Sequence, residues 1–389
     1  MGEPRILVSS LPFAGHVGAL AAVSNELVRR GHDVVVHTGA KYRHKFEGAE
    51  WLPWTRAPDF DDAELARTFP SVGDGKGMRA NFANVRDVLA GTGAAQARDV
   101  LEAEFDLVVT DHLAFGAAMA AELRDVPWVT VAVTPLVTSR QLARVVSRLI
   151  VDGMFNRMRA EAGLQPKPGS LEAFYSSELV LAQGVHDLET VRVPRQVRFV
   201  GRLITPARPA GLPEWWPDLD GRTVVHVTQG TLETGAEDLL RPAIEQLRGH
   251  DVLVVATTGG APVETLGTLP GNVRAAEFIP HDLLLPRTDV MITNGGWGGV
   301  LAALEAGVPM VVVPGELDKA QVARRVKVAG AGIVRRKPNR LGEAVDQVLA
   351  RPGHRVRARE LGEQITAAGG AAKAADLVEG IRRPRVKQR

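Results

Sequence analysis

Short valine-rich runs alternate with helix-like segments along nearly the whole chain, and this alternation constrains the fold more than any other feature. Apolar β-branched runs of this length, separated by helices, predict parallel strands that are covered on both faces. In the first half the expected strands are 5–10, 33–37, 106–110 and 128–133, and the expected helices are 18–30 and 115–124.

The same alternation starts again after a proline-rich stretch, residues 202–217. In the second half the expected strands are 223–228, 251–257, 290–293 and 310–313, and the expected helices are 238–247 and 297–306. We therefore predict an α/β protein with two doubly wound, Rossmann-like domains, residues 1–205 and 221–389, which are joined by a linker at 206–220 and face each other across a cleft.

The composition narrows the chemistry and the partners. The 389 residues include 47 basic and 45 acidic side chains, a formal net charge of +2, which gives no reason to expect nucleic acid as a partner. Cysteine is absent, so disulfides, thiolate catalysis and cysteine-ligated metals are excluded. No apolar segment reaches the roughly 18 residues of a membrane helix, and residues 1–10 lack a signal-peptide pattern. We expect a cytoplasmic monomer or homodimer without a membrane partner.

A glycine-rich segment, residues 294–299 (NGGWGG), lies between an expected strand and an expected helix. Glycines after a strand let the backbone approach a bulky anion, and the following helix offers N–H groups and the positive end of its dipole. A turn that only packs tightly is the alternative, but four glycines exceed what packing needs. We predict that this loop binds a diphosphate.

A nicotinamide dinucleotide is the competing guest for such a fold. It requires G-x-G-x-x-G in the first turn between strand and helix, and an acidic residue at the end of the second strand. Here residues 11–18 read LPFAGHVG, and the second strand ends in His37-Thr38-Gly39. Because both signals are missing, a Rossmann oxidoreductase is disfavoured.

His16 stands in that first turn, at the edge of the sheet where active-site groups gather in such folds. Asp111 follows the expected strand 106–110, so its carboxylate would reach the same edge. A histidine titrates at about pH 6.5, and with a carboxylate on its other nitrogen it is a competent general base. From the residues alone, a purely structural Asp111 fits the sequence equally well.

Two acidic clusters are weaker candidates. Residues 59–62 (DFDD) contain a D-x-D pattern that could hold a divalent metal, but they follow a proline in a loop-like stretch, and a solvated turn is the better interpretation. Residues 186–189 combine a histidine with two carboxylates, but their spacing fits no metal-ligand pattern. We predict no metal site.

Several further stretches accompany these motifs. They are residues 12–17, 199–201, 215–216, 227–231, 278–282, 293–300, 307–309 and 318–319. In order and spacing, the whole set resembles the nucleotide-sugar-dependent glycosyltransferases of family 1, in the macrolide-glycosyltransferase-like branch that is common among actinobacterial natural-product enzymes. The resemblance covers nearly the whole chain. It implies the GT-B fold and transfer of a sugar from a nucleotide diphosphate to a small acceptor.

The resemblance also implies a role for each matching residue. His16 matches the base that takes the proton from the acceptor hydroxyl, and Asp111 matches the aspartate that orients it. Asp318 and Lys319 match the pair that contacts the hydroxyls of the donor sugar. The residues that match the site of the nucleotide and its phosphates are Gly230, Thr231, Phe278, Ile279, Pro280, Asn294, Gly295, Gly296, Gly298 and Gly299.

The chain departs from the family pattern at some of these positions. In many relatives the phosphate loop begins with histidine and carries serine or threonine five residues later, where this chain has Asn294 and Gly299. Lys319 stands where many members have glutamine, which leaves the sugar open. The expected base is present, and backbone N–H groups are expected to make more of the phosphate contacts.

The implied reaction is inverting transfer from a UDP- or dTDP-sugar as co-substrate, without a metal or other cofactor. Two other classes share the fold: nucleotide-sugar epimerases and non-catalytic helper proteins. An epimerase needs acid–base groups on both faces of the sugar, and only His16 and Asp111 stand out. A helper should have lost His16 or the glycine loop, and both are present.

Two amphipathic segments of the first half, residues 140–158 and 81–89, are candidates for an acceptor wall. Most apolar helix faces are simply core, and that interpretation stays open here. In the other interpretation the two segments line an apolar pocket, with Phe13 and Phe82 as acceptor-binding residues. The expected acceptor is then a polyketide-like or aromatic alcohol, rather than a free sugar or a protein.

Overall fold

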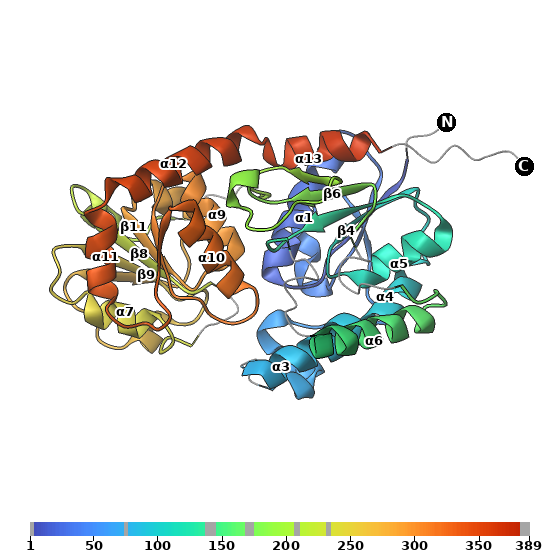
Figure 1. Ribbon diagram of the computed structural model, residues 1–389, viewed down its shortest axis with the longest axis horizontal. Coiled ribbons are helices and arrows are strands. Elements are labelled where there is room, and N and C mark those ends of the chain that lie inside the picture. Colours follow the sequence, from blue (N-terminus) through green and yellow to red (C-terminus); the bar gives the residue numbers. More distant parts are fainter. Residues whose placement is uncertain are drawn as a thin grey trace, which may run out of the picture. The chain divides into compact units, whose positions relative to one another are not determined.

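The computed structural model describes residues 4–73, 77–136, 145–167, 175–205, 211–230 and 235–381, and within 145–150 the backbone only. The chain forms two compact units, each built on one parallel sheet (Figure 1). Unit 1 comprises Met1–Gln183, Val191–Thr205 and Gly369–Arg389, and unit 2 comprises Gly184–Thr190 and Pro206–Ala368.

The sheet of unit 1 has the strand order β3-β2-β1-β4-β5-β6-β7. The order reverses between β1 and β4, and the carboxyl ends of strands at such a point form the usual binding edge of a doubly wound sheet. Ser9, the last residue of β1, pairs with His37 and with Thr110, so β1, β2 and β4 end within one residue of one another. The strands are β1 (Ile6–Ser9), β2 (Val34–His37), β3 (Glu50–Leu52), β4 (Leu107–Asp111), β5 (Trp128–Ala132), β6 (Leu179–Ala182) and β7 (Val197–Phe199).

Helices cover both faces of this sheet because successive strand residues point to opposite sides. Ile6 and Val8 pack in one core with helices α1 and α13, whereas Leu7 packs in another with α4 and α5. The helices of unit 1 are α1 (Ala14–Arg29), α2 (Leu65–Thr68), α3 (Gly77–Ala83), a π-helical stretch (Asn84–Ala90), α4 (Gly91–Val100), α5 (Phe115–Arg124), α6 (Val145–Glu161) and α13 (Gly370–Glu379).

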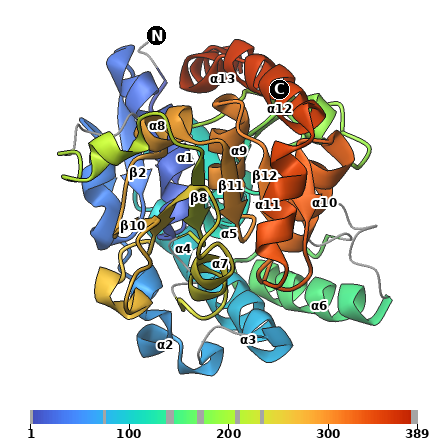
Figure 2. The same cartoon turned by 90° about the vertical axis from the view of Figure 1, so that its left-hand side faces the viewer.

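The sheet of unit 2 has the order β10-β9-β8-β11-β12-β13. Figure 2 faces this unit, with β10 toward the left of the sheet, β8 and β11 in the middle and β12 toward the right. Thr293, the last residue of β11, pairs with Thr228 and Val312, so β8, β11 and β12 also end level. The strands are β8 (Val224–Thr228), β9 (Leu253–Thr257), β10 (Val273–Ala276), β11 (Val290–Thr293), β12 (Met310–Val312) and β13 (Gly332–Val334).

The helices of unit 2 also lie on two faces. Met291 of β11 packs with α9, α10 and α12, and the neighbouring Val290 and Ile292 pack with α7 and α11. The helices are α7 (Leu240–Gln246), α8 (His281–Leu284), α9 (Trp297–Glu305), α10 (Lys319–Ala329), α11 (Leu341–Leu349) and α12 (Pro352–Ala367). Across the described part of the chain, every helix is too short or too polar to cross a membrane.

The division into units differs from the predicted 1–205, 206–220 and 221–389 in where two segments belong. Gly369–Arg389 belongs to unit 1, because α13 buries Ala374, Ala375 and Val378 beside α1 (Figure 1). Gly184–Thr190 belongs to unit 2, where Glu189 forms a buried ion pair of 2.6 Å with Arg325.

The predicted linker also differs from what the structure describes. Residues 206–210 lie outside the described part of the chain. The remainder is not an open connection: Trp216–Leu219 forms a short 3-10 helix whose Leu219 packs on β8 and β9. Two tryptophans, Trp215 and Trp216, pack against the same cluster. Residues that look like a linker from their proline content are therefore held to unit 2 by aromatic side chains.

Candidate active site

His16 lies in the first turn of α1, which begins at Ala14. The sequence predicted a loop here and a helix from residue 18, and the difference has a local cause. The N-cap residue Phe13 offers no side-chain cap, but the Asp62 carboxylate accepts the Ala14 N–H at 2.9 Å. An acceptor at this position satisfies a helix N-terminus and interacts favourably with the helix dipole, so the helix extends back to include His16.

The structure brings His16 and Asp111 together. His16 Nδ1 lies 2.5 Å from Asp111 Oδ2, and the Asp111 carboxylate is fully buried at the end of β4. Backbone N–H groups also bind this carboxylate: Leu113 donates to Oδ1 at 2.9 Å and Leu11 to Oδ2 at 3.4 Å. The carboxylate is therefore held from three sides and oriented toward the imidazole.

The charge of Asp111 follows from its surroundings. Burial alone would raise the pKa of the carboxyl, but the charge of His16 and the neighbouring imidazole of His112 outweigh it and hold the pKa below its ordinary value. An ionised carboxylate only accepts hydrogen bonds, so Nδ1 of His16 carries the proton of the short contact. In the neutral ring, Nε2 then has the lone pair that a general base needs.

Residues 59–62 fit the expected solvated turn only in part: Asp59 and Asp61 are exposed, whereas the Asp62 side chain is nearly buried. Only 5% of the Asp62 side chain is exposed, and in addition to Ala14 it binds Lys41 Nζ at 2.6 Å and the Tyr42 hydroxyl at 2.7 Å. Asp59 accepts the backbone N–H of Ala40 at 2.8 Å. The acidic segment therefore ties the start of α1 to residues 40–42, and its carboxylates bind protein donors.

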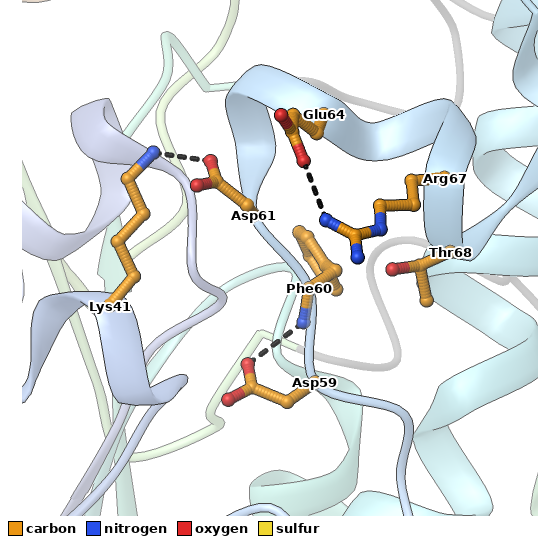
Figure 3. A pocket seen from close by; sticks show the side chains of 7 residues that line it. All are labelled: Lys41, Asp59, Phe60, Asp61, Glu64, Arg67 and Thr68. Atoms are coloured by element: carbon orange, nitrogen blue, oxygen red, sulfur yellow. Dashed lines mark hydrogen bonds and ion pairs between the residues drawn. The ribbon is translucent and has the colours of Figure 1, made fainter.

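A surface pocket of about 300 Å³ borders this segment (Figure 3). Four of its charged side chains are paired with one another: Lys41 with Asp61, and Arg67 with Glu64 at 3.2 Å. The fifth, Asp59, accepts the backbone N–H groups of Ala40 and Phe60. Charges that already compensate each other leave little charge to attract an ionic ligand. The pocket thus gives no independent reason to expect an ionic ligand.

The two expected acceptor-binding residues lie in different surroundings. Phe13 is buried, with its ring 5.4 Å from that of His16 and 5.2 Å from that of Phe60. Phe82, on α3, is 44% exposed, and its ring packs under the guanidinium of Arg86. Phe13 therefore belongs to the wall next to His16, whereas Phe82 is largely exposed and its ring contacts Arg86.

The expected amphipathic helix 140–158 corresponds to α6, Val145–Glu161. Residues 137–144 lie outside the described part of the chain, as do the side chains up to residue 150. Of the described residues, Phe155 and Met158 are buried against α4 and α5, and the ring of Phe155 meets that of Phe115 edge-on at 4.8 Å. This part of the helix is core rather than pocket wall.

In unit 2 the glycine loop has the geometry expected of a close approach by a ligand. Gly295 has φ +89°, and Gly296 is the N-cap of α9. A Cβ on Gly295 would lie 3.2 Å from Lys319 O, whereas a Cβ on Gly296 would meet nothing closer than Asn294 Oδ1 at 3.9 Å. Gly295 is thus required by the backbone, and Gly296 leaves open space before the helix N-terminus.

The other expected donor residues gather around this loop. Asn294 Nδ2 donates to Gln229 O at 2.5 Å, which holds the loop beside Gly230 at the end of β8. Lys319, at the start of α10, touches the loop through Gly295, and Asp318 is the N-cap of the same helix. Thr231 lies outside the described residues.

The segment after β10 is the third part of this constellation. Ile279 and Pro280 are buried, whereas 66% of Phe278 is exposed. Pro280 precedes α8, whose His281 would contact a Cβ at Gly299 at 3.5 Å, so the segment adjoins the start of α9. Gly298 is open on the same turn. The described residues predicted for the donor thus converge on the carboxyl edge of one sheet.

Sequence reasoning missed two residues of the His16 surroundings. Asp62 was considered only as a metal ligand, since nothing in the sequence shows that it reaches Ala14. His112 was not considered, although a titratable residue directly after a strand-end carboxylate is a visible signal. Its ring stacks on that of His16 at 6.4 Å and on that of Tyr175 at 6.0 Å.

Comparisons with known proteins identify the family of the chain. Residues 241–379 match the family described as erythromycin biosynthesis protein CIII-like, C-terminal domain. The 4'-demethylrebeccamycin synthase of Lentzea aerocolonigenes is 38% identical in an alignment of 420 positions, gaps included, that covers 97% of this chain and 99% of the relative. A desosaminyl transferase of Saccharopolyspora erythraea, acting on 3-alpha-mycarosylerythronolide B by name, is 27% identical over 72% of this chain and 70% of its own.

Solved structures show the same fold. The calicheamicin glycosyltransferase superposes with a TM-score of 0.76 at 24% identity, covering 98% of both chains. The prediction of two doubly wound units is confirmed, and the fold is that of the GT-B glycosyltransferases. The chain belongs to the family of natural-product glycosyltransferases that includes the rebeccamycin and macrolide enzymes. It is an enzyme that transfers a glycosyl group, so the epimerase and helper alternatives are set aside.

Proposed function

We propose that this enzyme transfers a sugar from a UDP- or dTDP-sugar to a hydroxyl of a small apolar aglycone, with inversion at the anomeric carbon and with His16 as the general base. The observation that carries the proposal is the 2.5 Å contact of His16 Nδ1 with the buried carboxylate of Asp111. That contact leaves Nε2 as the basic nitrogen and provides a negative charge that stabilises the imidazolium formed during the reaction.

The chemistry of the step is a direct displacement. The acceptor hydroxyl gives its proton to His16 Nε2, and its oxygen forms a bond to the anomeric carbon. The bond from that carbon to the diphosphate oxygen breaks, and the nucleoside diphosphate leaves with the electron pair. Attack opposite to the leaving group inverts the configuration, and no covalent enzyme intermediate is needed.

The donor is assigned to unit 2. Backbone N–H groups around Gly296 and the N-terminus of α9 would bind the diphosphate and stabilise the charge that develops as it leaves. Phe278 would contact the nucleobase, and Asp318 with Lys319 the sugar hydroxyls. The choice of nucleotide rests on relatives: avaP of Aspergillus versicolor is named a UDP-glucosyltransferase, and the structure of VinC is a complex with dTDP. This mechanism uses no metal and no other cofactor.

The acceptor class rests on the wall around His16 and on the relatives' products. The Phe13 ring packs beside that of His16 and contacts Phe60, and the His112 ring stacks on that of His16 and on that of Tyr175. Aromatic walls of this kind favour planar apolar ligands. One relative is named for making 4'-demethylrebeccamycin, and another for transferring desosamine to 3-alpha-mycarosylerythronolide B. An aromatic or polyketide alcohol is therefore the proposed acceptor.

A matrix of donors and acceptors tests the proposal. UDP- and dTDP-hexoses are each combined with aromatic alcohols, macrolide aglycones, free sugars and a protein, and release of nucleoside diphosphate is measured. We expect acceptor-dependent release with the aromatic or macrolide alcohols and, by NMR, a product of inverted anomeric configuration. Turnover confined to sugars or protein would refute the acceptor class, and a retained configuration would refute the displacement mechanism.

A further inference from the structure

His112 is a buried imidazole next to the expected catalytic pair. Only 7% of the residue is exposed. Its ring lies parallel to that of His16, with an interplanar angle of 11°, and parallel to that of Tyr175, with an angle of 5°. The three rings come from the start of α1, the end of β4 and the segment before β6. Their stack fixes the plane of the His112 ring.

The polar atoms of His112 define how its proton is placed. Nδ1 is buried without a hydrogen-bond partner of standard geometry, and Asp111 Oδ1 lies 3.3 Å away. Nε2 lies 3.2 Å from the Thr134 hydroxyl oxygen. Because the ionised Asp111 only accepts hydrogen bonds, the favourable tautomer carries its proton on Nδ1. Nε2 is then the acceptor, and the Thr134 hydroxyl donates to it.

The two oxygens of Asp111 are thereby divided between two imidazoles. Oδ2 faces His16, and Oδ1 faces His112. Each hydrogen-bond donor on a carboxylate stabilises its negative charge and weakens its hold on a further proton. A donor on Oδ1 therefore reduces how strongly Asp111 stabilises the imidazolium form of His16.

We propose that His112 is a positioning residue that donates Nδ1–H to Asp111 and thereby keeps His16 unprotonated, and so able to act as base, at neutral pH. The inference rests on the proposed role of His16. It deepens that role because it identifies what sets the pH range in which the base works. Without His112, Asp111 would hold a proton on His16 to a higher pH.

The other charged or titratable groups near the pair are identified by their contacts. Tyr175 stacks on the far face of His112. At the start of α1, Asp62 binds Ala14 N–H and is itself paired with Lys41. These groups remain in place in all the variants below, so differences among the variants report on the Asp111 contact.

Three substitutions separate the effect of the hydrogen bond from His112 to Asp111 from the effect of the stacked His112 ring. His112→Phe keeps a flat ring for the stack but removes both nitrogens. His112→Asn retains a donor at the position of Nδ1, facing Asp111. His112→Gln instead places its amide near the position of Nε2, facing Thr134. The measured quantity is kcat/KM against pH, whose acid limb reports protonation of the base in the free enzyme.

We expect His112→Phe and His112→Gln to move the acid limb upward by about half a pH unit or more. His112→Asn should return it to the wild-type position. The affinity for UDP or dTDP, measured by calorimetry, should be the same in all three variants, because the nucleotide is assigned to unit 2. A limb that stays in place in His112→Phe while kcat falls equally at every pH would overturn the inference and leave only a structural role.

A second variant covers the case in which the His112 substitutions do not fold. Thr134→Val is nearly isosteric and removes the hydrogen bond to Nε2. An imidazole without that hydrogen bond is a weaker Nδ1–H donor to Asp111, so the acid limb should shift in the same direction. An unshifted limb in Thr134→Val would then overturn the inference. His16→Ala separates failure of the proposed base from failure of the role of His112. If that variant keeps its turnover, the proposed base is wrong. If His16→Ala is inactive and the limbs do not move, only the role of His112 is wrong.

Discussion

Asp111 is buried and ionised beside His16, so its charge and its orientation act together. Asp111→Asn removes the charge and presents an amide N–H to an imidazole that must itself donate. We expect kcat to fall by roughly 100-fold or more, as is typical when a base loses its orienting partner. The affinity for nucleoside diphosphate should not change. A kcat within a few fold of wild type would show that Asp111 is a structural carboxylate, the alternative that the sequence left open.

Two adjacent glycines of the phosphate loop make a matched pair. Gly296 has open space at its Cβ position, so Gly296→Val should weaken binding of UDP and dTDP by about tenfold or more while thermal stability stays near wild type. Gly295 has φ +89°, and a Cβ there would lie 3.2 Å from both Lys319 O and Val312 Cγ1, so Gly295→Ala should lower thermal stability. Calorimetry and thermal unfolding of both variants check the prediction. Unchanged nucleotide affinity in Gly296→Val would mean that the loop is only a turn.

The residues of the site differ in how far the sequence could identify them. His16 and Asp111 follow strands whose apolar runs are plain, so the sequence was sufficient to predict that they share one edge of the sheet. The glycine loop could be located by the same argument from strand ends, supported by the resemblance to the family. Asp62 acts through a contact with Ala14, 48 positions away, and His112 through stacking on the His16 ring. The amino-acid sequence alone shows neither contact.

At the scale of elements, the position of α1 depends on a residue from another segment. Asp62→Ala leaves Ala14 N–H and the Tyr42 hydroxyl without their acceptor, and the first turn of α1 carries His16. We expect roughly tenfold lower kcat and a lower unfolding temperature, since a lost buried acceptor costs about 1–3 kcal/mol.

Asp61 provides the control for that variant. Its carboxylate also binds Lys41, but it is 46% exposed and does not reach Ala14. Asp61→Ala should therefore keep nearly wild-type kcat, although it loses some stability because Asp61 also accepts the Ala63 N–H at 2.8 Å. Equal effects of the two substitutions would show that the ion pairs with Lys41, rather than the contact with α1, are what matters.

The predicted elements agree best where the chain is fully buried. The structure reproduces the expected strand 290–293 and the expected helix 115–124, and it starts α9 at the expected residue 297. The strands that the sequence did not reveal include β3, β7, β10 and β13, which have three or four residues and are partly exposed. Such short edge strands carry too few apolar residues to show a periodic pattern.

At the scale of the whole molecule, the alternation of strands and helices was sufficient to predict two units, but not which unit holds each segment. The small residues of α13 pack in the core of unit 1, and Glu189 pairs with Arg325 in unit 2. Both partners are far along the chain, so the sequence does not show which unit each segment joins. The proline content predicted a linker at 206–220, but Trp215 and Trp216 pack part of that segment against unit 2. Composition reports local flexibility, whereas unit membership depends on packing partners far along the chain.

Each unit buries a histidine in its neutral form, which makes stability depend on pH. Burial lowers the pKa of His37 in unit 1 to about 4, and burial with the charge of His281 lowers the pKa of His226 in unit 2 to about 3. Unfolding returns both to about 6.5, so between that pH and the folded value the unfolded chain binds more protons. Stability is therefore full above about pH 6.5 and falls as the pH is lowered toward 4.

His226→Leu isolates one of these protons. We measure the free energy of unfolding by urea at pH 7 and at pH 5. Its decrease from pH 7 to pH 5 should be about 2 kcal/mol smaller in the variant than in the wild type. The test uses the change in unfolding free energy between the two pH values, because the substitution also changes stability at every pH. An identical pH dependence in both proteins would show that His226 is protonated in the fold or does not titrate on unfolding.

The most direct test of the account is the turnover of His16→Ala with a nucleotide sugar and an aromatic alcohol that the wild type glycosylates. We predict that acceptor-dependent release of nucleoside diphosphate falls by at least about 100-fold. The dissociation constant for the nucleoside diphosphate, measured by calorimetry on the same preparation, should remain at the wild-type value. Near-normal turnover in His16→Ala would contradict the account, because the deprotonation step would then belong to another group.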